Sequence, residues 1–192
     1  MTLTLAKWTI NEYHSMIEAG LLDHRQVELL QGNIVEMSPE GKAHAYFSSE
    51  AEDYLRGLLE NRATVRSGKP ITLPNNSEPE PDIAIVQKLG REYLTHHPYP
   101  ENIFWVIEYS HSSLEKDLSI KTKIYAEAGI REYWVVNLRQ RQLIVFCEPQ
   151  ATGYAAKSIL STGIVYPSAF SDLAIEVEQI ISKYRDFALA VS

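Results

Sequence analysis

The stretch from Phe104 to Asn137 constrains the fold more than any other part of the sequence. Its pattern predicts a buried strand over 104–109, a helix over 113–128 and a second buried strand over 132–136. The first strand is apolar on both sides, which is typical of a central strand that is covered on both faces. Glu108 interrupts that apolar surface. Since an ionised carboxylate is costly in such a place, we expect a positive group to meet it.

Side chains along the first strand should alternate between the two faces of the sheet. We therefore expect Phe104, Val106 and Glu108 on one side. The residues expected on the other side are Ile103, Trp105 and Ile107. In an α/β sheet, ligands gather outside the carboxyl ends of the strands, and Glu108 lies at that end.

The helix that follows contains three lysines, of which one is predicted to face the sheet. A capping box at 112–115 opens the helix and Gly129 ends it. At 100° per residue, the apolar residues share one arc: Leu114, Leu118, Ile120, Ile124, Tyr125 and Ala128. Lys121 falls near the centre of this arc, and Lys116 and Lys123 fall on the opposite side. One interpretation is that Lys121 buries its stem and pairs its ammonium with Asp117 or Glu108; the other is that it acts in catalysis.

The rest of the chain predicts further helices and strands around this unit. The expected elements are a helix from a capping box at 9–12 to near Gly20, a hairpin around 31–33, a helix over 42–60, strands over 64–73 and 83–86, a β region around Gly153 and Gly163, and a closing helix over 178–189. We expect an α/β protein, borderline α+β, with a mixed β-sheet flanked by helices. Residues 1–192 should form a single domain.

Composition excludes several classes of protein. Hydrophobic residues make up 45% of the chain and charged residues 22%, which is ordinary for a globular protein, and no apolar run is long enough to span a membrane. The N-terminal segment lacks the pattern of a signal peptide, so we expect a cytoplasmic protein with no membrane partner. A net charge of −7 argues against nonspecific binding of nucleic acid through a basic surface.

Asp82, Glu108 and Lys121 together form a set that is typical of metal-dependent phosphodiesterases. Asp82 follows a proline at the start of the predicted strand 83–86. Two carboxylates on adjacent strands can hold a hard divalent cation such as Mg²⁺. The cation neutralises charge on the phosphate oxygens and lowers the pKa of a water, and a partly desolvated lysine stabilises the transition state. Asp82 could instead be an ordinary turn residue after a proline.

The order and spacing of these residues resemble the Uma-two family of endonucleases, within the PD-(D/E)XK restriction-endonuclease-like superfamily. The residues that carry the resemblance span most of the chain: 27–39 (VELLQGNIVEMSP), His44, 81–86 (PDIAIV), 105–110 (WVIEYS), 117–125 (DLSIKTKIY), 128–130 (AGI) and 132–136 (EYWVV). The resemblance implies a restriction-endonuclease-like core of αβββαβ type.

The resemblance also implies roles for individual residues. Asp82 and Glu108 would be ligands of Mg²⁺ or Mn²⁺, and Lys121 the catalytic lysine. The superfamily's usual lysine position, two residues after the glutamate, is Ser110 in this sequence. Peripheral site candidates are Glu28, His44 and Tyr125. Glu28 could equally be a solvated hairpin residue, and His44 a histidine with a local hydrogen bond at the start of its helix.

Three functions therefore stay open from the sequence. The first is a divalent-metal-dependent endonuclease that hydrolyses phosphodiester bonds, of DNA in the first place, with a homodimer as one way to cut two strands. The second is a catalytically inactive module with a nuclease fold that binds nucleic acid or a protein partner, which the acidic net charge favours. The third is a metal-dependent hydrolase of a small phosphate ester.

Overall fold

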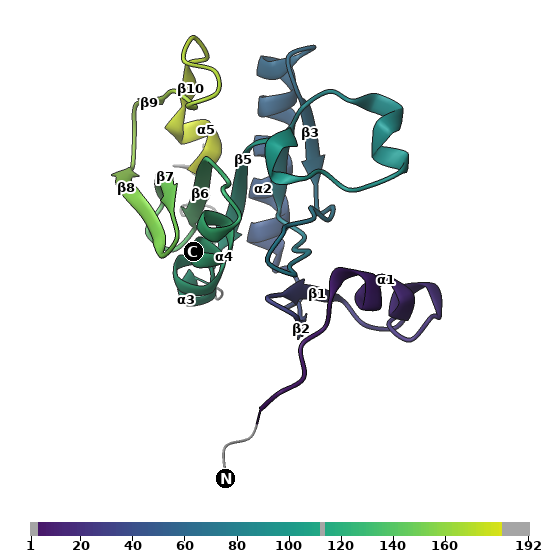
Figure 1. Ribbon diagram of the computed structural model, residues 1–192. Helices are drawn as coiled ribbons and strands as arrows, with labels where there is room; N and C mark the ends of the chain where they lie inside the picture. Colours follow the sequence, from purple (N-terminus) through teal and green to yellow (C-terminus); the bar gives the residue numbers. More distant parts are fainter. Residues whose placement is uncertain (1–3, 112–113, 182–192) are drawn as a thin grey trace.

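A six-stranded mixed sheet forms the centre of the molecule in the computed structural model, which describes residues 4–111 and 114–181. The strands, in spatial order, are β3 (Thr64–Ser67), β4 (Ile83–Val86), β5 (Ile103–Ser110), β6 (Glu132–Asn137), β7 (Gln142–Gln150) and β8 (Gly153–Leu160) (Figure 1). β5 and β6 run parallel, and the other neighbours are antiparallel. The predicted mixed sheet is confirmed.

Helices cover both faces of this sheet, as predicted. The helices are α1 (Ile10–Glu18), α2 (Lys42–Leu59), α3 (Leu114–Lys116), α4 (Thr122–Glu127) and α5 (Val177–Ile181), with short 3₁₀ turns at Gly90–Leu94 and Pro100–Asn102. Two small hairpin-like pairs join them: β1 (Val27–Leu30) with β2 (Asn33–Glu36), and β9 (Ile164–Val165) with β10 (Ile175–Glu176). None of the helices in the described ranges is long and apolar enough to cross a lipid bilayer.

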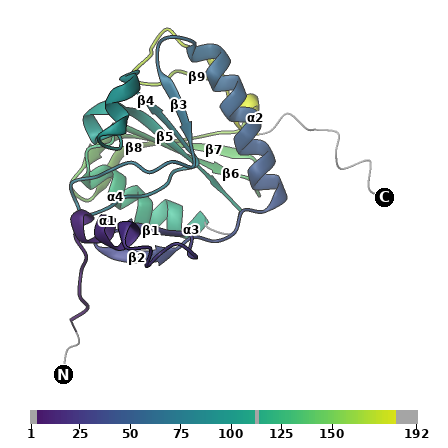
Figure 2. The same ribbon diagram turned by 90° about the vertical axis from the view of Figure 1, so that its right-hand side faces the viewer.

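The two faces of the sheet have separate cores. On one face, α2 and α5 pack against the buried side chains of Trp105, Ile107 and Trp134. On the other, Ile124 and Tyr125 of α4 pack with Leu30 of the hairpin against the strands. Figure 2 shows α2 on one side of the sheet and α1, the β1–β2 hairpin and α4 on the other. Apolar side chains on both faces explain why β4, β5 and β6 are continuously hydrophobic.

The predicted alternation of β5 is wrong at its first two residues. The pairing with β4 skips from Trp105 opposite Ile85 to Ile103 opposite Val86, so Phe104 is an inserted residue. This bulge turns Phe104 towards the α2 side, where its ring lies 4.8 Å from that of Phe170, and Ile103 joins the opposite core. Val106 and Glu108, beyond the bulge, keep the predicted relation to Trp105 and Ile107.

The helix between β5 and β6 is not the continuous α-helix that the sequence predicts. The predicted capping box includes residues 112 and 113, which lie outside the described residues. Between α3 and α4 the chain makes a π-helical turn, Asp117–Lys121. A π turn holds more residues than an α turn, so a strict 100° step does not continue through it. Ile120 was therefore placed wrongly: it is 49% exposed, whereas Lys121 is buried as predicted.

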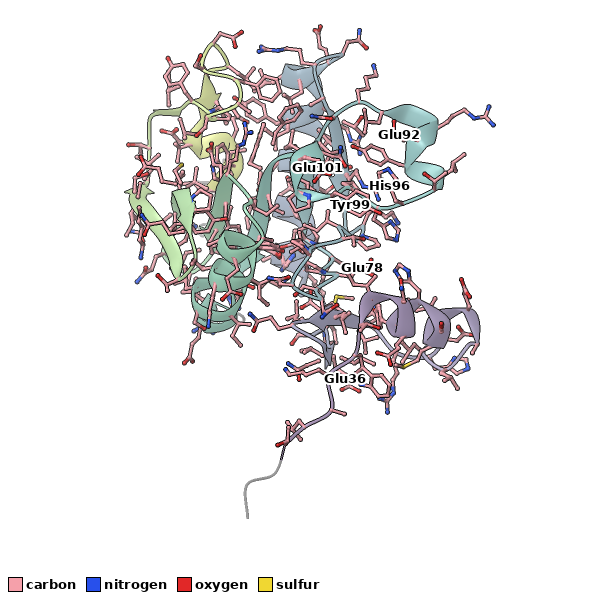
Figure 3. The ribbon with its side chains drawn as sticks, viewed as in Figure 1. Glu36, Glu78, Glu92, His96, Tyr99 and Glu101 are labelled. Carbon is pink, nitrogen blue, oxygen red and sulfur yellow. The ribbon has the colours of Figure 1, made fainter. Side chains whose placement is uncertain are left out.

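The remaining differences concern the ends of elements. The strand predicted over 64–73 stops at Ser67, because Gly68 takes a positive φ of 52° and turns the chain. The 87–102 segment beyond β4 is a loop with short helical turns, in which His96 stacks on Tyr99 with ring centroids 4.5 Å apart (Figure 3). The closing helix begins at Val177, and the part of it predicted beyond Ile181 lies outside the described residues.

Candidate metal-binding and catalytic site

Asp82 and Glu108 are neighbours across the β4–β5 pair. Ile83, the first residue of β4, pairs with Ile107 in antiparallel register; Asp82 directly precedes Ile83 and Glu108 directly follows Ile107. Ala84 and Val106 form the next pair further into the sheet, and both belong to the core on the α4 side. The carboxyl end of β5 and the start of β4 thus bring two acids to one edge of the sheet, as the sequence predicted.

Glu108 is buried and is held by two donors. Its side chain is about 5% exposed, and its Oε1 atom accepts hydrogen bonds from Lys121 Nζ at 2.8 Å and from the Tyr125 hydroxyl at 2.7 Å. Burial raises the pKa of Glu108 to about 8 although the Lys121 ammonium lowers it, and the carboxylates of Asp82 and Asp117 add to the rise. Ionisation of Glu108 is therefore costly unless positive charge beyond that of Lys121 is present.

Lys121 is the positive group that meets Glu108. Its side chain is 7% exposed, and Nζ lies 3.5 Å from Glu28 Oε2 as well as 2.8 Å from Glu108 Oε1. Burial lowers the pKa of the ammonium, but Glu108, Glu28 and Asp117 raise it by more, so the group stays protonated. The pairing with Glu108 is one the sequence suggested, yet the ammonium itself is buried rather than in water. Lys123, by contrast, is 57% exposed.

Asp82 is held from two directions. Its Oδ2 atom accepts a hydrogen bond from the backbone N–H of Tyr109 at 2.5 Å, and its Oδ1 atom lies 2.8 Å from His44 Nε2. Both side chains are about one sixth exposed. Burial lowers the pKa of His44, but the hydrogen bond and the charge of Asp82 raise it above its usual value. His44 therefore belongs to the same cluster, and its bond is not confined to its own helix.

Ser110 fills the position at which the superfamily carries its lysine. Its buried hydroxyl donates a hydrogen bond to Asp117 Oδ2, and both side chains are almost fully buried. The bond ties the end of β5 to the π-helical turn. Because Lys121 belongs to that same turn, the bond helps to fix the direction in which the lysine enters the site.

Glu28 reaches the cluster from the hairpin. It is 1% exposed, so the interpretation of Glu28 as a solvated hairpin residue is wrong. β1 is held against the 77–78 segment by backbone bonds between Leu29 and Glu78, with N···O distances of 2.7 and 3.4 Å. Figure 3 labels Glu78 between α1 and the remainder of the chain. The hairpin thus contributes a third buried carboxylate beside Lys121.

Glu40 is a residue that sequence reasoning missed. One carboxylate oxygen of Glu40, a ring nitrogen of His44 and a carboxylate oxygen of Asp82 all lie within 4.8 Å of one another. Across the described residues, this is the group of three or more acids and histidines whose spacing could hold a metal ion. The available signal was an acid four residues before a histidine, on the turn that precedes a helix. That signal is too common among surface residues to be informative alone.

The charges of the site fit a cation. Three carboxylates, those of Glu28, Glu108 and Asp117, act on the buried lysine, and Asp82 acts on Glu108. With His44 protonated, the acids still outnumber the bases. Carboxylate oxygens are the ligands that Mg²⁺ and Mn²⁺ prefer, and Asp82 and His44 are partly exposed, so water can reach them.

Comparison with known proteins identifies the family. The model of the Uma2 family, described as "Putative restriction endonuclease", matches residues 10–178. The chain belongs to the Uma2 family. The match includes every residue of the site described above. Comparison with curated proteins found no match.

A solved structure has a fold similar to that of this Uma2 chain. The crystal structure of a putative nuclease of the DUF820 family from Anabaena variabilis ATCC 29413 superimposes with a TM-score of 0.63 and 15% sequence identity. The alignment covers 81% of this chain and 89% of the other. At this identity the likeness extends to the fold, and the mixed sheet with its flanking helices is common to both.

Proposed function

We propose that this Uma2 protein is a divalent-metal-dependent endonuclease that hydrolyses phosphodiester bonds of DNA. The observation that carries the proposal is the buried ammonium of Lys121, bonded to Glu108 and close to Glu28, with Asp82 near enough to Glu108 to raise its pKa. A purely structural ion pair requires one carboxylate. Here a single lysine lies among several, which is typical of a site that binds further positive charge and an anionic substrate together.

The residues have distinct roles in this proposal. Asp82 and Glu108 flank the position of a Mg²⁺ or Mn²⁺ ion, which when bound would neutralise charge on the phosphate oxygens and lower the pKa of the attacking water. Lys121 supplies a fixed ammonium to the negative charge that grows on the phosphate oxygens. Tyr125 holds Glu108, which in turn holds that ammonium, and the charge of Glu28 attracts the ammonium directly. His44 fixes the side chain of Asp82.

A cleavage assay tests the proposal directly. Purified protein with Mg²⁺ or Mn²⁺ should cut a supercoiled plasmid, and EDTA should abolish cutting. Asp82→Asn and Lys121→Met should each lower the rate by about 100-fold or more, the size expected when a charge that stabilises the transition state is removed. Lys123→Met is the matched control, because this lysine lies on the exposed side of the same segment.

Two outcomes would contradict the proposal: no cleavage of DNA by the folded protein with either ion, or full cleavage by both site variants. RNA and mononucleotide esters should be assayed in parallel, because cleavage of esters without cleavage of polymers would favour a small-molecule phosphodiesterase.

The second candidate function is a binding module with an inactive nuclease fold. The net charge of −7 favours it, since such a surface does not attract DNA. Calorimetric titration distinguishes the two. An inactive module has no reason to bind Mg²⁺ or Mn²⁺ at Asp82, so heat of binding that Asp82→Asn removes favours the enzyme.

A further inference from the structure

Glu40 and His44 lie on either side of the start of α2, and they meet Asp82 from a distant part of the chain. Glu40 lies in the turn that precedes α2, His44 in the first turns of α2, and Asp82 at the start of β4. Their nearest ligand atoms all lie within 4.8 Å of one another, and the His44–Asp82 distance is 2.8 Å. Donors bound to one ion at about 2.1 Å are roughly 3.0–3.4 Å apart. Glu40 is exposed, so its carboxylate is free to move towards the other two donors.

Glu108 does not belong to this trio. Its Oε1 atom is held by Lys121 and Tyr125, whereas Asp82 is held by His44 and by the backbone N–H of Tyr109. Asp82 and Glu108 influence each other through their charges. Asp82 is therefore the residue that the two halves of the site share. One half offers an imidazole and an exposed carboxylate, and the other a buried carboxylate with an ammonium.

We propose that Glu40 and His44 are metal ligands together with Asp82, and that this donor set selects Mn²⁺ over Mg²⁺. The inference rests on the proposed function, in which Asp82 binds a divalent ion, and it names the remaining protein ligands. Glu108, whose Oε1 atom is held by Lys121 and Tyr125, would add negative charge near the ion. Imidazole nitrogen suits transition metals, whereas Mg²⁺ favours oxygen ligands and retains its own waters.

The exposure of the three side chains agrees with a catalytic rather than a structural ion. Glu40 is exposed, and His44 and Asp82 are each about one sixth exposed, so water can reach the three side chains. Three protein ligands would leave positions on the ion for water and a phosphate oxygen. The positive end of the α2 dipole opposes a cation here by up to about 1 kcal/mol, which two carboxylates outweigh. The same helix end has no side-chain cap, and it favours an anionic phosphate beside the ion.

The alternative explanation is that His44 and Asp82 form only an ion pair that anchors α2 to the sheet. That explanation gives Glu40 no function and predicts no preference among metal ions. In the ion pair, a proton lies between His44 and Asp82. In the metal site, the ion takes the place of that proton.

Metal titration of the full chain decides between them. Free Mn²⁺ is measured by electron paramagnetic resonance at pH 7.5, and Mg²⁺ is added as competitor. Wild type should bind Mn²⁺ at least about 10-fold more tightly than Mg²⁺. Glu40→Gln and His44→Gln should each weaken Mn²⁺ binding by at least about 10-fold, and His44→Gln should also reduce the preference over Mg²⁺. Gln at 44 can still donate to Asp82, so α2 stays anchored.

The matched controls are Glu50→Gln and His24→Gln, an exposed acid further along α2 and an exposed histidine away from the site. Both should bind Mn²⁺ as wild type does. The increase in melting temperature on adding Mn²⁺, compared with EDTA, gives a second measurement that is independent of cleavage. The inference would be overturned if Glu40→Gln and His44→Gln both bound Mn²⁺ as tightly as wild type and showed the same increase in melting temperature with Mn²⁺.

The two proposals fail in distinguishable ways. The protein could bind Mn²⁺ through Glu40 and His44 and yet cut no nucleic acid. That result would support the metal ligands and refute the proposed endonuclease activity. The opposite result is cleavage at equal rates in Mg²⁺ and Mn²⁺, with the same rates in Glu40→Gln and His44→Gln. That result would support the endonuclease and refute the proposal that Glu40 and His44 bind the metal.

Discussion

At the scale of single residues, the site depends on the balance between Lys121 and the carboxylates around it. The ammonium is bonded to Glu108, lies close to Glu28 and is nearly inaccessible to water. Removing one partner of such a buried pair leaves an uncompensated charge, which typically costs about 3–5 kcal/mol. The lysine therefore contributes to stability as well as to the proposed catalysis.

We predict that Lys121→Met lowers the free energy of unfolding by about 3 kcal/mol, because Glu108 then lacks its positive partner. Lys123→Met should change it by less than about 0.5 kcal/mol, because that pair is exposed. Urea unfolding in EDTA measures both. The double variant Lys121→Met with Glu108→Gln should lose less than the sum of the single changes, by about 1–3 kcal/mol. Strict additivity would show that the two side chains are not coupled.

At the scale of elements, the site depends on two irregular segments. The π-helical turn Asp117–Lys121 sets the direction of Lys121, and its Asp117 is bonded to Ser110 at the end of β5. The β1–β2 hairpin brings Glu28 beside the lysine, and its turn residue Gly32 is bonded through its backbone to Trp8 and Asn76. Because both backbone groups of Gly32 are engaged, the turn cannot shift to accommodate a larger residue.

We predict that Gly32→Ala lowers the free energy of unfolding by about 1–3 kcal/mol. Gly32 has a φ of 73°, and an added Cβ atom would lie 3.0 Å from the carbonyl oxygen of Trp8. Gly57→Ala is the matched control. Gly57 lies in α2, and beyond its own helix backbone and chain neighbours no heavy atom lies within 4 Å of the added Cβ, so alanine should stabilise the protein by about 0.5–1 kcal/mol. Thermal and urea unfolding compare the two, and equal effects would contradict the steric argument.

At the scale of the whole molecule, charge sets the conditions for binding DNA. A protein of net charge −7 repels a polyanion unless a local cation reverses the sign at the site. The acids that make up the site add to this repulsion when no ion is bound. Binding of DNA should therefore depend on a divalent ion before any cleavage takes place.

We predict that the protein binds a fluorescent DNA duplex at least about 10-fold more weakly in EDTA than in Ca²⁺, an ion with similar oxygen ligands. Fluorescence anisotropy at fixed ionic strength measures both affinities. Asp82→Asn should bind the duplex with nearly the same affinity in EDTA and in Ca²⁺. An affinity that EDTA does not change in wild type would show that the ion plays no part in binding.

The sequence by itself determined most of the helices and strands and three candidate site residues, Asp82, Glu108 and Lys121, because these follow from local patterns. Apolar periodicity located the strands around Asp82 and Glu108. Helical geometry selected Lys121 over Lys123, although the assumption of a continuous α-helix was wrong. A residue near the centre of an apolar arc stays buried when the turn widens, whereas Ile120, nearer its margin, became exposed. Family resemblance added Glu28 and His44, which the structure brings to the same cluster.

Only the tertiary structure decided which of these side chains meet, because their contacts join segments far apart in the chain. The bulge at Phe104 depends on pairing with β4, and the π-helical turn accompanies the bond between Ser110 and Asp117. Glu40 was undetectable in the sequence, since an exposed acid before a helix has no distinguishing pattern. Its place beside His44 and Asp82 depends on how α2 docks against the start of β4, which apolar packing across the whole sheet determines.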